Sequence, residues 1–272
     1  MIEKQILRFL EEDIGYGDIT TESIHRGEEL RAVIKAKEEG VLAGIDFALK
    51  VFELLGDFKV IYRAQEGKEF KKGEELLVLE GPGDVLLKGE RTALNLLQRL
   101  SGIATLTRQF VKRLEGTKTK LLDTRKTTPG LRYFEKYAVR VGGALNHRFA
   151  LYDMVLIKDN HKVMAGGIKE AIRRVKEKLS PAYKVEVEIE RLEELEVALE
   201  LGVDMVLLDN LSPQEIKEAL KLIKGRCLVE VSGNITLENI KDYALEGVDF
   251  ISSGAITHSA RWIDLSMKVF RI

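Results

Sequence analysis

The sequence predicts an α/β protein whose larger part is an irregular, incomplete α/β barrel, preceded by a small open α+β sandwich domain. Two observations support the barrel. From residue 119 onward, short apolar β-rich runs alternate with helical patterns, which is typical of parallel strands joined by helices. Nearly every run ends in charged or small polar residues, and barrels place their chemistry at the carboxyl ends of their strands.

The barrel strands and helices are expected in the second half of the chain. Six strands are fewer than the eight of a regular barrel, and residues 131–150 fit a helix or a strand equally well, which is why an incomplete barrel is expected. The strands are predicted at 120–123, 154–157, 184–189, 205–208, 227–231 and 250–252, and the helices at 167–179, 191–201, 213–223 and 236–245.

The first part of the chain has a different pattern. Short strand-like runs separated by turns surround one amphipathic helix, which indicates a small α+β domain. A long helical pattern then leads into the barrel, with leucines recurring on one face. The strands are expected at 31–37, 58–64 and 76–79, and the helices at 46–55 and 85–114.

These patterns predict two domains. The N-terminal domain is expected to span residues 1–103 and to be completed by the C-terminal segment 259–272. The catalytic barrel is expected to span residues 104–258. A chain of 272 residues is long enough for each part to bury its own apolar core.

Composition limits the classes of partner. Lys and Arg number 43 against 44 Asp and Glu, so the net charge of -1 provides no broad field for nucleic acid or an anionic membrane. The single Cys227 excludes an internal disulfide and fits a reducing compartment. No apolar run approaches the ~18 residues of a membrane span. We therefore expect a cytoplasmic protein with neither a nucleic-acid nor a membrane partner.

The run 185–190 alternates valine or isoleucine with three glutamates. If the apolar face meets the helices, the glutamates point into the barrel, where an ionised carboxylate requires a basic or metal partner. An edge strand with a solvated face explains the alternation equally well.

Several cations follow predicted strands. Arg125 and Lys126 follow Thr124 at one strand end, just before a turn, which suits anion binding as well as an ordinary charged loop. His147 and Arg148 follow a glycine pair. Lys158 ends another apolar strand and could pair with phosphate or form a Schiff base.

Acidic and small residues end the remaining strands. Asp209 and Glu188 together make a plausible pair of ligands for Mg²⁺ bridged by a substrate phosphate. Two glycine turns precede predicted helices and can present backbone N–H groups to a phosphate, although each turn alone is weak evidence. The turns are Ser232-Gly233-Asn234 and Ser253-Gly254-Ala255, the second of which is followed by His258.

Taken in order, the motifs resemble those of the quinolinate phosphoribosyltransferase family. The likeness extends from Asp13-Ile14-Gly15-Tyr16-Gly17-Asp18 to Gly254-Ala255-Ile256-Thr257-His258, so it covers nearly the whole chain. One departure is Val141, where the family usually has a third glycine before Asn-His-Arg. The other motifs are Gly89 to Asn95, Asp123 to Thr127, Asn146-His147-Arg148, Ile157 to His161, Glu186-Val187-Glu188, Leu208-Asp209-Asn210 and Ser232-Gly233-Asn234.

The resemblance implies an enzyme of NAD biosynthesis that converts quinolinate and phosphoribosyl pyrophosphate to nicotinate mononucleotide, pyrophosphate and CO2. It also implies a homodimer in which Arg91 acts in trans. By motif match, Arg91, Arg125, His147 and Arg148 would hold the quinolinate carboxylates, while Lys126 and Lys158 would meet carboxylate or phosphate oxygens. Glu188 and Asp209 would hold the ribose hydroxyls and Mg²⁺, and the two serine-glycine turns would hold the 5′-phosphate.

Three alternatives remain at this stage. The nearest is a related phosphoribosyltransferase for another pyridine or aromatic substrate, including the homologues attached to molybdenum transport systems. The second is an aldolase that forms a Schiff base at Lys158. The third is a phosphate-binding protein without catalytic activity.

Overall fold

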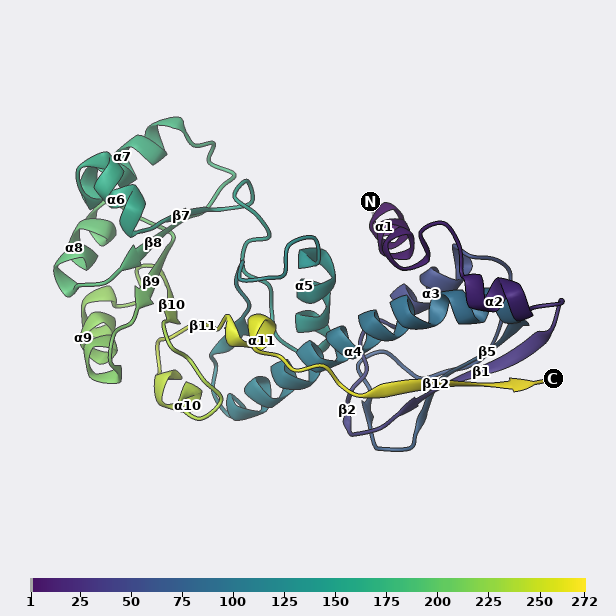
Figure 1. Ribbon diagram of the computed structural model, residues 1–272. Coiled ribbons are helices and arrows are strands. Elements are labelled where there is room, and N and C mark those ends of the chain that lie inside the picture. The colour runs from purple at the N-terminus through teal and green to yellow at the C-terminus, as the bar shows by residue number, and fades with distance from the viewer. Residues whose placement is uncertain (1) are drawn as a thin grey trace. The chain divides into compact units, whose positions relative to one another are not determined.

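The computed structural model describes residues 2–272 and divides the chain into two compact units (Figure 1). Unit 1 consists of the described part of Met1–Arg108 together with Thr128–Gly143 and Ser259–Ile272. Unit 2 consists of Gln109–Thr127 and Ala144–His258.

Unit 1 is built on an antiparallel sheet. Its strand order is β12-β1-β5-β3, so the last strand of the chain, β12, pairs with the first, β1. The short strands β2 (Gly40–Val41) and β4 (Glu69–Phe70) form a separate pair. The other strands are β1 (Glu29–Ala36), β3 (Lys59–Arg63), β5 (Glu75–Pro82) and β12 (Leu265–Arg271), and the first helices are α1 (Ile2–Ile14), α2 (Ile19–Ile24) and α3 (Ile45–Glu53).

Helix α4 (Gly83–Arg113) is the long helix that the sequence predicts, and its last residues belong to unit 2. The repeated apolar residues on its predicted face are buried, because Leu94, Leu97, Leu100 and Ile103 are all at most 2% exposed. This face therefore contributes to the apolar core.

The observed division differs from the predicted one in two places. The first stretch of unit 1 ends at Arg108 and not at residue 103. Residues 128–143, which were expected in the barrel, belong to unit 1 because of helix α5 (Arg132–Val141). The ring of Phe134 packs against Phe9 and Phe47, with centroids 5.8 and 4.8 Å away. The following residues to Ala150 contain no further named strand, so the ambiguous stretch is a helix and a loop.

Unit 2 contains a six-stranded parallel sheet with the order β6-β11-β10-β9-β8-β7. Strands β7 to β11 lie in chain order, and β6 follows β11, as in a barrel. No ladder joins β6 to β7 in residues 2–272, so the barrel is incomplete, as predicted. The strands are β6 (Lys120–Leu122), β7 (Val155–Ile157), β8 (Val185–Ile189), β9 (Met205–Asp209), β10 (Leu228–Ser232) and β11 (Phe250–Ser252).

Helices connect these strands (Figure 1). Helix α9 begins where the sequence predicts, because the Ser212 side chain accepts from the backbone N–H of Glu215, and Pro213 occupies the first turn. The predicted helix 236–245 is shorter than expected. The helices are α6 (Asp159–Ala165), α7 (Ile168–Lys178), α8 (Leu192–Glu200), α9 (Pro213–Ile223), α10 (Ile240–Tyr243) and α11 (Ala255–His258).

Within residues 2–272, no helix has the length and apolar character required to cross a membrane.

Candidate active site

The carboxyl ends of the unit 2 strands meet at one edge of the parallel sheet. Residues near these ends are aligned by the strand register, which pairs Asp209 with Ser232 and Ser252 with Leu122. The polar residues that follow the strands therefore come from distant parts of the sequence but face a common region.

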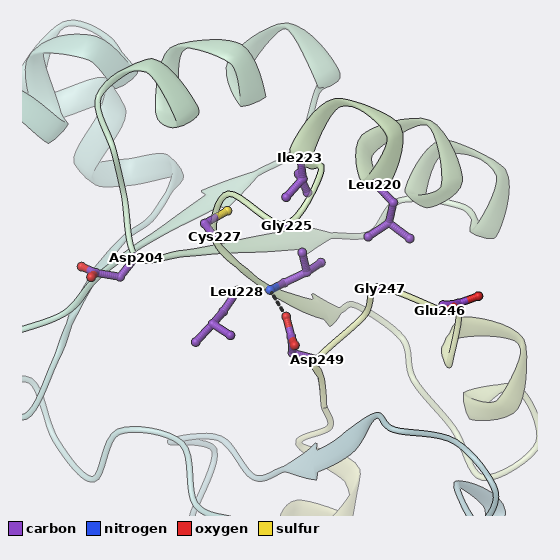
Figure 2. A pocket seen from close by; sticks show the side chains of 10 residues that line it. Asp204, Leu220, Ile223, Gly225, Cys227, Leu228, Glu246, Gly247 and Asp249 are labelled. Carbon is purple, nitrogen blue, oxygen red and sulfur yellow. Dashed lines mark hydrogen bonds between the residues drawn. The ribbon is translucent and has the colours of Figure 1, made fainter.

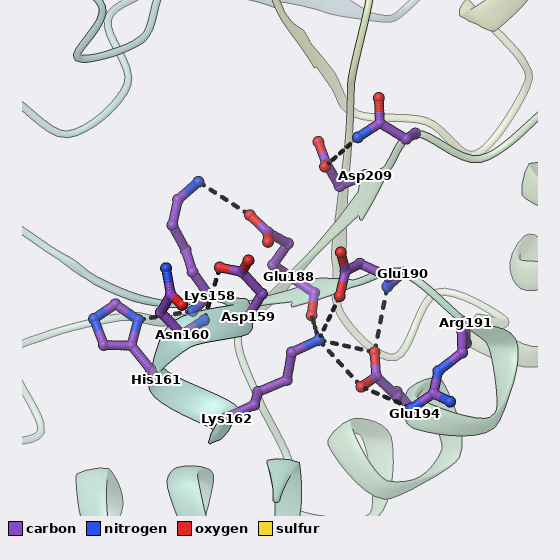
Figure 3. Close-up of polar contacts among 11 residues, drawn as sticks. Lys158, Asp159, Asn160, His161, Lys162, Glu188, Glu190, Arg191, Glu194 and Asp209 are labelled. Atoms are coloured by element: carbon purple, nitrogen blue, oxygen red, sulfur yellow. Dashed lines mark hydrogen bonds and ion pairs between the residues drawn. The ribbon is translucent and has the colours of Figure 1, made fainter. Parts of the chain in front are cut away.

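Lys158 and Glu188 form an ion pair at this edge, with Nζ and Oε2 separated by 3.0 Å (Figure 3). Lys158 follows β7 and is exposed, whereas Glu188 lies in β8 and is buried. The sequence predicts that a glutamate pointing into the barrel has a basic partner, and Lys158 is that partner for Glu188. Because a surface-exposed lysine is mobile, it can leave Glu188 for a substrate oxygen.

Asp209, at the end of the neighbouring strand β9, completes an acidic pair with Glu188. Burial and the charge of Glu188 raise the pKa of Asp209. A divalent cation would relieve both costs, and oxygen donors are what Mg²⁺ prefers. Glu188 and Asp209 therefore fit the site of a cation that is also held by substrate oxygens.

Arg125 and Arg148 supply positive charge near each other. Burial, followed by the charge of Arg125, lowers the pKa of Arg148. The Arg125 Nε is buried and has no hydrogen-bond partner, while one nitrogen of Arg148 donates to the Met154 carbonyl at 3.0 Å. Two neighbouring guanidinium groups, one with an unused buried donor, are chemically suited to an anion.

The loop that carries His147 and Arg148 is held by a buried aspartate. Both carboxylate oxygens of Asp123 are used, since one accepts from the backbone N–H of His147 at 2.8 Å and the other from the Asn146 side chain at 2.6 Å. Asp123 directly follows β6 and is fully buried. It therefore fixes the position from which Arg148 extends.

The imidazole of His147 lies between two buried glutamates. Its Nε2 is 3.0 Å from Glu186 and 3.3 Å from Glu230, and its Nδ1 accepts from the backbone N–H of Arg148 at 2.7 Å. Burial raises the pKa of Glu186. Burial disfavours a charged His147, but the hydrogen bond to Glu186 and the proximity of Glu230 outweigh this and raise the pKa of the imidazole.

These two observations point to different protonation states of His147. The electrostatic field favours the imidazolium, whereas Nδ1 can accept a hydrogen bond only in the neutral form. The hydrogen bond at 2.7 Å decides the state in this geometry, so the proton lies on Nε2 and Glu186 is the group that burial favours in its protonated form.

His147, Glu186 and Glu230 could also hold a metal ion, because their ligand atoms all lie within 4.8 Å of one another. A neutral imidazole that donates to Glu186 accounts for the same arrangement without an ion.

The two predicted glycine turns are joined to the other strand ends. The backbone N–H of Asn210 donates to the Ser232 carbonyl at 3.0 Å, and Gly233 adopts a positive φ of 102°. A side chain at Gly233 would lie 2.3 Å from Asn210, so glycine is required there. The Ser253 hydroxyl donates to the Ile235 carbonyl at 3.0 Å, which links the second turn to the first.

The second turn also contacts the loop after β6. The hydroxyl of Thr257 donates to the Lys126 carbonyl at 2.8 Å, and the side chains of Lys126 and His258 both lie beside Gly254. Lys126 and His258 are exposed, and the Thr124 hydroxyl accepts from the backbone N–H of Lys126. The structure thus brings the unit 2 residues predicted for the site to one edge of the sheet.

Arg91 is the exception, because it lies on α4 in unit 1, where it is exposed. One part of the β8 expectation is also wrong. Glu186 and Glu188 are buried as inward-facing residues, but Glu190 follows the end of β8 and its side chain is 49% exposed.

Three buried carboxylates were not predicted as part of the site: Asp123, Glu186 and Glu230. For Glu230 the available indication was one acidic residue in the apolar run Leu228 to Val231. An isolated acid within a buried strand indicates a buried polar partner. Asp123 and Glu186 lie in motifs from which only the neighbouring residues were predicted to bind substrate.

A separate hollow lies at the opposite, amino ends of three strands (Figure 2). Its volume is about 510 Å³, and its lining includes Asp204, Leu228 and Asp249, next to the starts of β9, β10 and β11. Asp249 is already used, because it accepts from the backbone N–H of Val229 at 2.8 Å. Burial raises the pKa of Cys227 in this wall, which keeps the thiol unreactive. The hollow is therefore distinct from the strand-end site.

The parallel strands and the polar cluster at their carboxyl ends define an α/β-barrel type of protein with a site for anionic substrates. Residues 18–101 match the family described as "Quinolinate phosphoribosyl transferase, N-terminal domain", and residues 103–268 match "Quinolinate phosphoribosyl transferase, C-terminal domain". The chain belongs to the quinolinate phosphoribosyl transferase family.

Individual relatives agree with this assignment. The chain is 44% identical to a probable nicotinate-nucleotide pyrophosphorylase (carboxylating) of Bacillus subtilis, over 98% of this chain and 93% of the relative. Identity to the corresponding protein of Methanocaldococcus jannaschii is 46%, over 98% and 97%. The crystal structure of NadC from Streptococcus pyogenes superimposes with a TM-score of 0.95 at 40% identity, over 100% of this chain and 97% of that one.

Proposed function

We propose that this protein is a quinolinate phosphoribosyltransferase, which joins quinolinate to phosphoribosyl pyrophosphate and forms nicotinate mononucleotide, pyrophosphate and CO2 in NAD biosynthesis. The observation that carries the proposal is the pair Arg125 and Arg148, two neighbouring guanidinium groups of which one has an unused buried donor. Relatives named nicotinate-nucleotide pyrophosphorylase (carboxylating) support the reaction.

Quinolinate has two carboxylates, and the cations of the site suit that charge. Arg125 and Arg148 bind these carboxylates together with Arg91 from a second subunit. Both ring nitrogens of His147 are engaged within the protein, so its part is to hold the loop that carries Arg148. Lys158 leaves Glu188 to meet a carboxylate or phosphate oxygen, and Lys126 supplies a further exposed cation. Binding a dianion offsets the burial and the repulsion from Arg125 that together lower the pKa of Arg148.

Phosphoribosyl pyrophosphate occupies the other half of the site. The turns at Ser232 to Asn234 and Ser253 to Ala255 hold its 5′-phosphate through backbone N–H groups, with His258 beside the second turn. Glu188 and Asp209 would hold the ribose hydroxyls and Mg²⁺, and the ion would supply positive charge to the departing pyrophosphate.

The chemistry follows from this arrangement. The pyridine nitrogen attacks the anomeric carbon as the bond to pyrophosphate breaks, and the carboxylates of Glu188 and Asp209 stabilise positive charge on the ribose. The product ring is a cationic pyridinium, so the electrons left by departing CO2 are stabilised next to the ring nitrogen. A proton then replaces the lost carboxylate.

A homodimer is part of the proposal. Arg91 lies in unit 1, whereas the strand-end cluster lies in unit 2. Large apolar side chains flank β7 and are 70–80% exposed: Leu151 and Tyr152 before the strand, and Val163 and Met164 after it. A second copy that covers these residues would remove them from water. The single, half-buried Cys227 is consistent with a cytoplasmic location.

A steady-state comparison of quinolinate with nicotinate tests the substrate. We expect kcat/KM to favour quinolinate, because nicotinate leaves one guanidinium without an anion. A preference for nicotinate would contradict the proposal. A mixture of Arg91→Ala and Arg125→Ala chains tests the dimer, since a shared site restores part of the activity in mixed dimers and a site within one chain does not.

A further inference from the structure

Lys162 is a buried lysine in helix α6 that the proposed reaction does not use. It is 7% exposed, although lysine is rarely buried unless its charge is paired. Its Nζ lies 3.0 and 3.1 Å from the two carboxylate oxygens of Glu194 and 3.4 Å from Glu190 (Figure 3). The same nitrogen donates to the backbone carbonyl of Glu188 at 3.2 Å.

Helix α6 therefore contacts Glu188 at two points. Lys158, the residue that caps the helix, pairs with the Glu188 carboxylate at 3.0 Å. Lys162, one turn further along, binds the Glu188 carbonyl. The exposed lysine can move toward a substrate. The buried lysine is held by the carboxylates of Glu190 and Glu194 and by the Glu188 carbonyl, so it fixes the backbone from which the Glu188 side chain extends.

The contacts of Lys162 continue beyond Glu188. Its Nζ also pairs with Glu190, which directly follows β8, at 3.4 Å. Glu194, at the start of α8, accepts from the backbone N–H of Glu190 at 3.3 Å as well as from Lys162. One buried ammonium thus connects α6, the end of β8 and α8.

We propose that Lys162 is a positioning residue for the phosphoribosyl pyrophosphate half of the site, which holds the end of β8 so that Glu188 faces both Lys158 and Asp209. Lys162 does not touch substrate. This inference rests on the proposed function for its kinetic consequence, but its geometric part concerns only contacts within unit 2.

The variant Lys162→Met keeps the length of the side chain and removes its charge. We expect the KM for phosphoribosyl pyrophosphate to rise about tenfold, because a hydrogen bond from a charged donor is lost at Glu188. The KM for quinolinate should change by less than about twofold, whereas kcat should also fall, because Glu188 stabilises the positive charge that develops on the ribose. The melting temperature should also fall, because the largely buried Glu194 loses its nearest cation.

The double variant Lys162→Met/Glu194→Gln distinguishes a positioning role of Lys162 from an effect on stability, and it replaces the single variant if that variant does not fold. Removal of the Glu194 charge should restore the melting temperature. The KM for phosphoribosyl pyrophosphate should stay raised, because the Glu188 carbonyl still lacks its donor. Lys178→Met, at an exposed lysine of α7, is the matched control and should leave both quantities unchanged.

Two results would overturn the proposal. One is a KM for phosphoribosyl pyrophosphate that is unchanged in Lys162→Met. The other is a KM that recovers together with the melting temperature in the double variant, which would make the role of Lys162 purely structural.

Failure of the proposed function is distinguishable, because it would appear as a wild-type protein without turnover or binding of phosphoribosyl pyrophosphate. Hydrogen–deuterium exchange of the amides of residues 188–194 would then test, without any substrate, whether Lys162 holds the end of β8. Faster exchange in Lys162→Met than in Lys178→Met supports the proposed contacts, and equal exchange contradicts them.

Discussion

A buried ion pair in unit 1 and three charged residues in unit 2 differ in how completely their buried polar atoms are hydrogen-bonded. In unit 1, the carboxylate of Glu135 is fully buried and accepts from Arg99 at 3.0 and 2.7 Å and from the hydroxyl and backbone N–H of Thr128. In unit 2, Arg125, Glu186 and Glu230 each retain a buried polar atom without a hydrogen bond. Among residues 2–272, these three are the charged side chains with such an atom.

This difference distinguishes charged residues that stabilise the fold from charged residues that can bind a ligand. A buried ion pair whose hydrogen bonds are complete holds two segments together and has little capacity left for a ligand. A buried charge with an unused donor or acceptor costs stability, and such costs are concentrated at binding sites. The Arg99–Glu135 pair therefore supports the fold, and Arg125 is available to bind substrate.

The largest expected effect is on the stability of unit 1. Arg99→Met leaves Glu135 buried without its cation, so the free energy of unfolding should fall by about 3–5 kcal/mol. Chemical denaturation measures this change, and Arg99→Met/Glu135→Gln should recover part of it. If the free energy of unfolding of Arg99→Met falls by less than about 1 kcal/mol, the Arg99–Glu135 pair does not stabilise the fold as proposed.

Arg125 should show the opposite profile. Arg125→Ala removes a like charge beside Arg148, so we expect little loss of stability and an increase in the pKa of Arg148 towards its ordinary range. Binding of quinolinate should weaken by about 2–5 kcal/mol, because the guanidinium pairs with a substrate carboxylate. Calorimetric titration with quinolinate checks the affinity, and unchanged binding would exclude Arg125 from the site.

Glu186 gives a smaller effect that depends on pH. Its pKa is raised by burial, so the folded protein holds the proton more tightly than the unfolded chain. The stability that this supplies is complete below the ordinary pKa of 4.5 and is lost as pH rises through the raised pKa. Glu186→Gln has no such loss.

Denaturation of both proteins at about pH 5 and about pH 8 tests this prediction. The Glu186→Gln variant should gain about 1–3 kcal/mol relative to the wild type at the higher pH and little at the lower pH. A difference that is independent of pH would show that Glu186 is ionised in the folded protein throughout this range.

The unit 2 strands could be predicted because their sequence pattern is local. All six lie within a residue or two of the predicted ranges, and their apolar runs are buried as expected for parallel strands covered by helices. The membership of α5 in unit 1 could not be predicted, because it depends on contacts of Phe134 with rings far away in the sequence.

The positions of the candidate site residues at strand ends were predictable for the same local reason, whereas the buried residues that contact them were not. Asp123, Glu186 and Glu230 act through contacts with a loop distant in sequence, and no spacing rule relates Glu230 to His147. In the sequence, Lys162 cannot be distinguished from an ordinary lysine on a helix surface, because its contact with the end of β8 depends on the tertiary structure. Periodicity predicts which face a residue occupies but does not identify its partner.

The most direct test of the central claim is a product assay with quinolinate labelled in the carboxylate next to the ring nitrogen, phosphoribosyl pyrophosphate and Mg²⁺. A strand-end site that binds both substrates predicts labelled CO2 and nicotinate mononucleotide in equal amounts, with neither formed when phosphoribosyl pyrophosphate is omitted. Binding of quinolinate without release of CO2, or CO2 release independent of phosphoribosyl pyrophosphate, would contradict it.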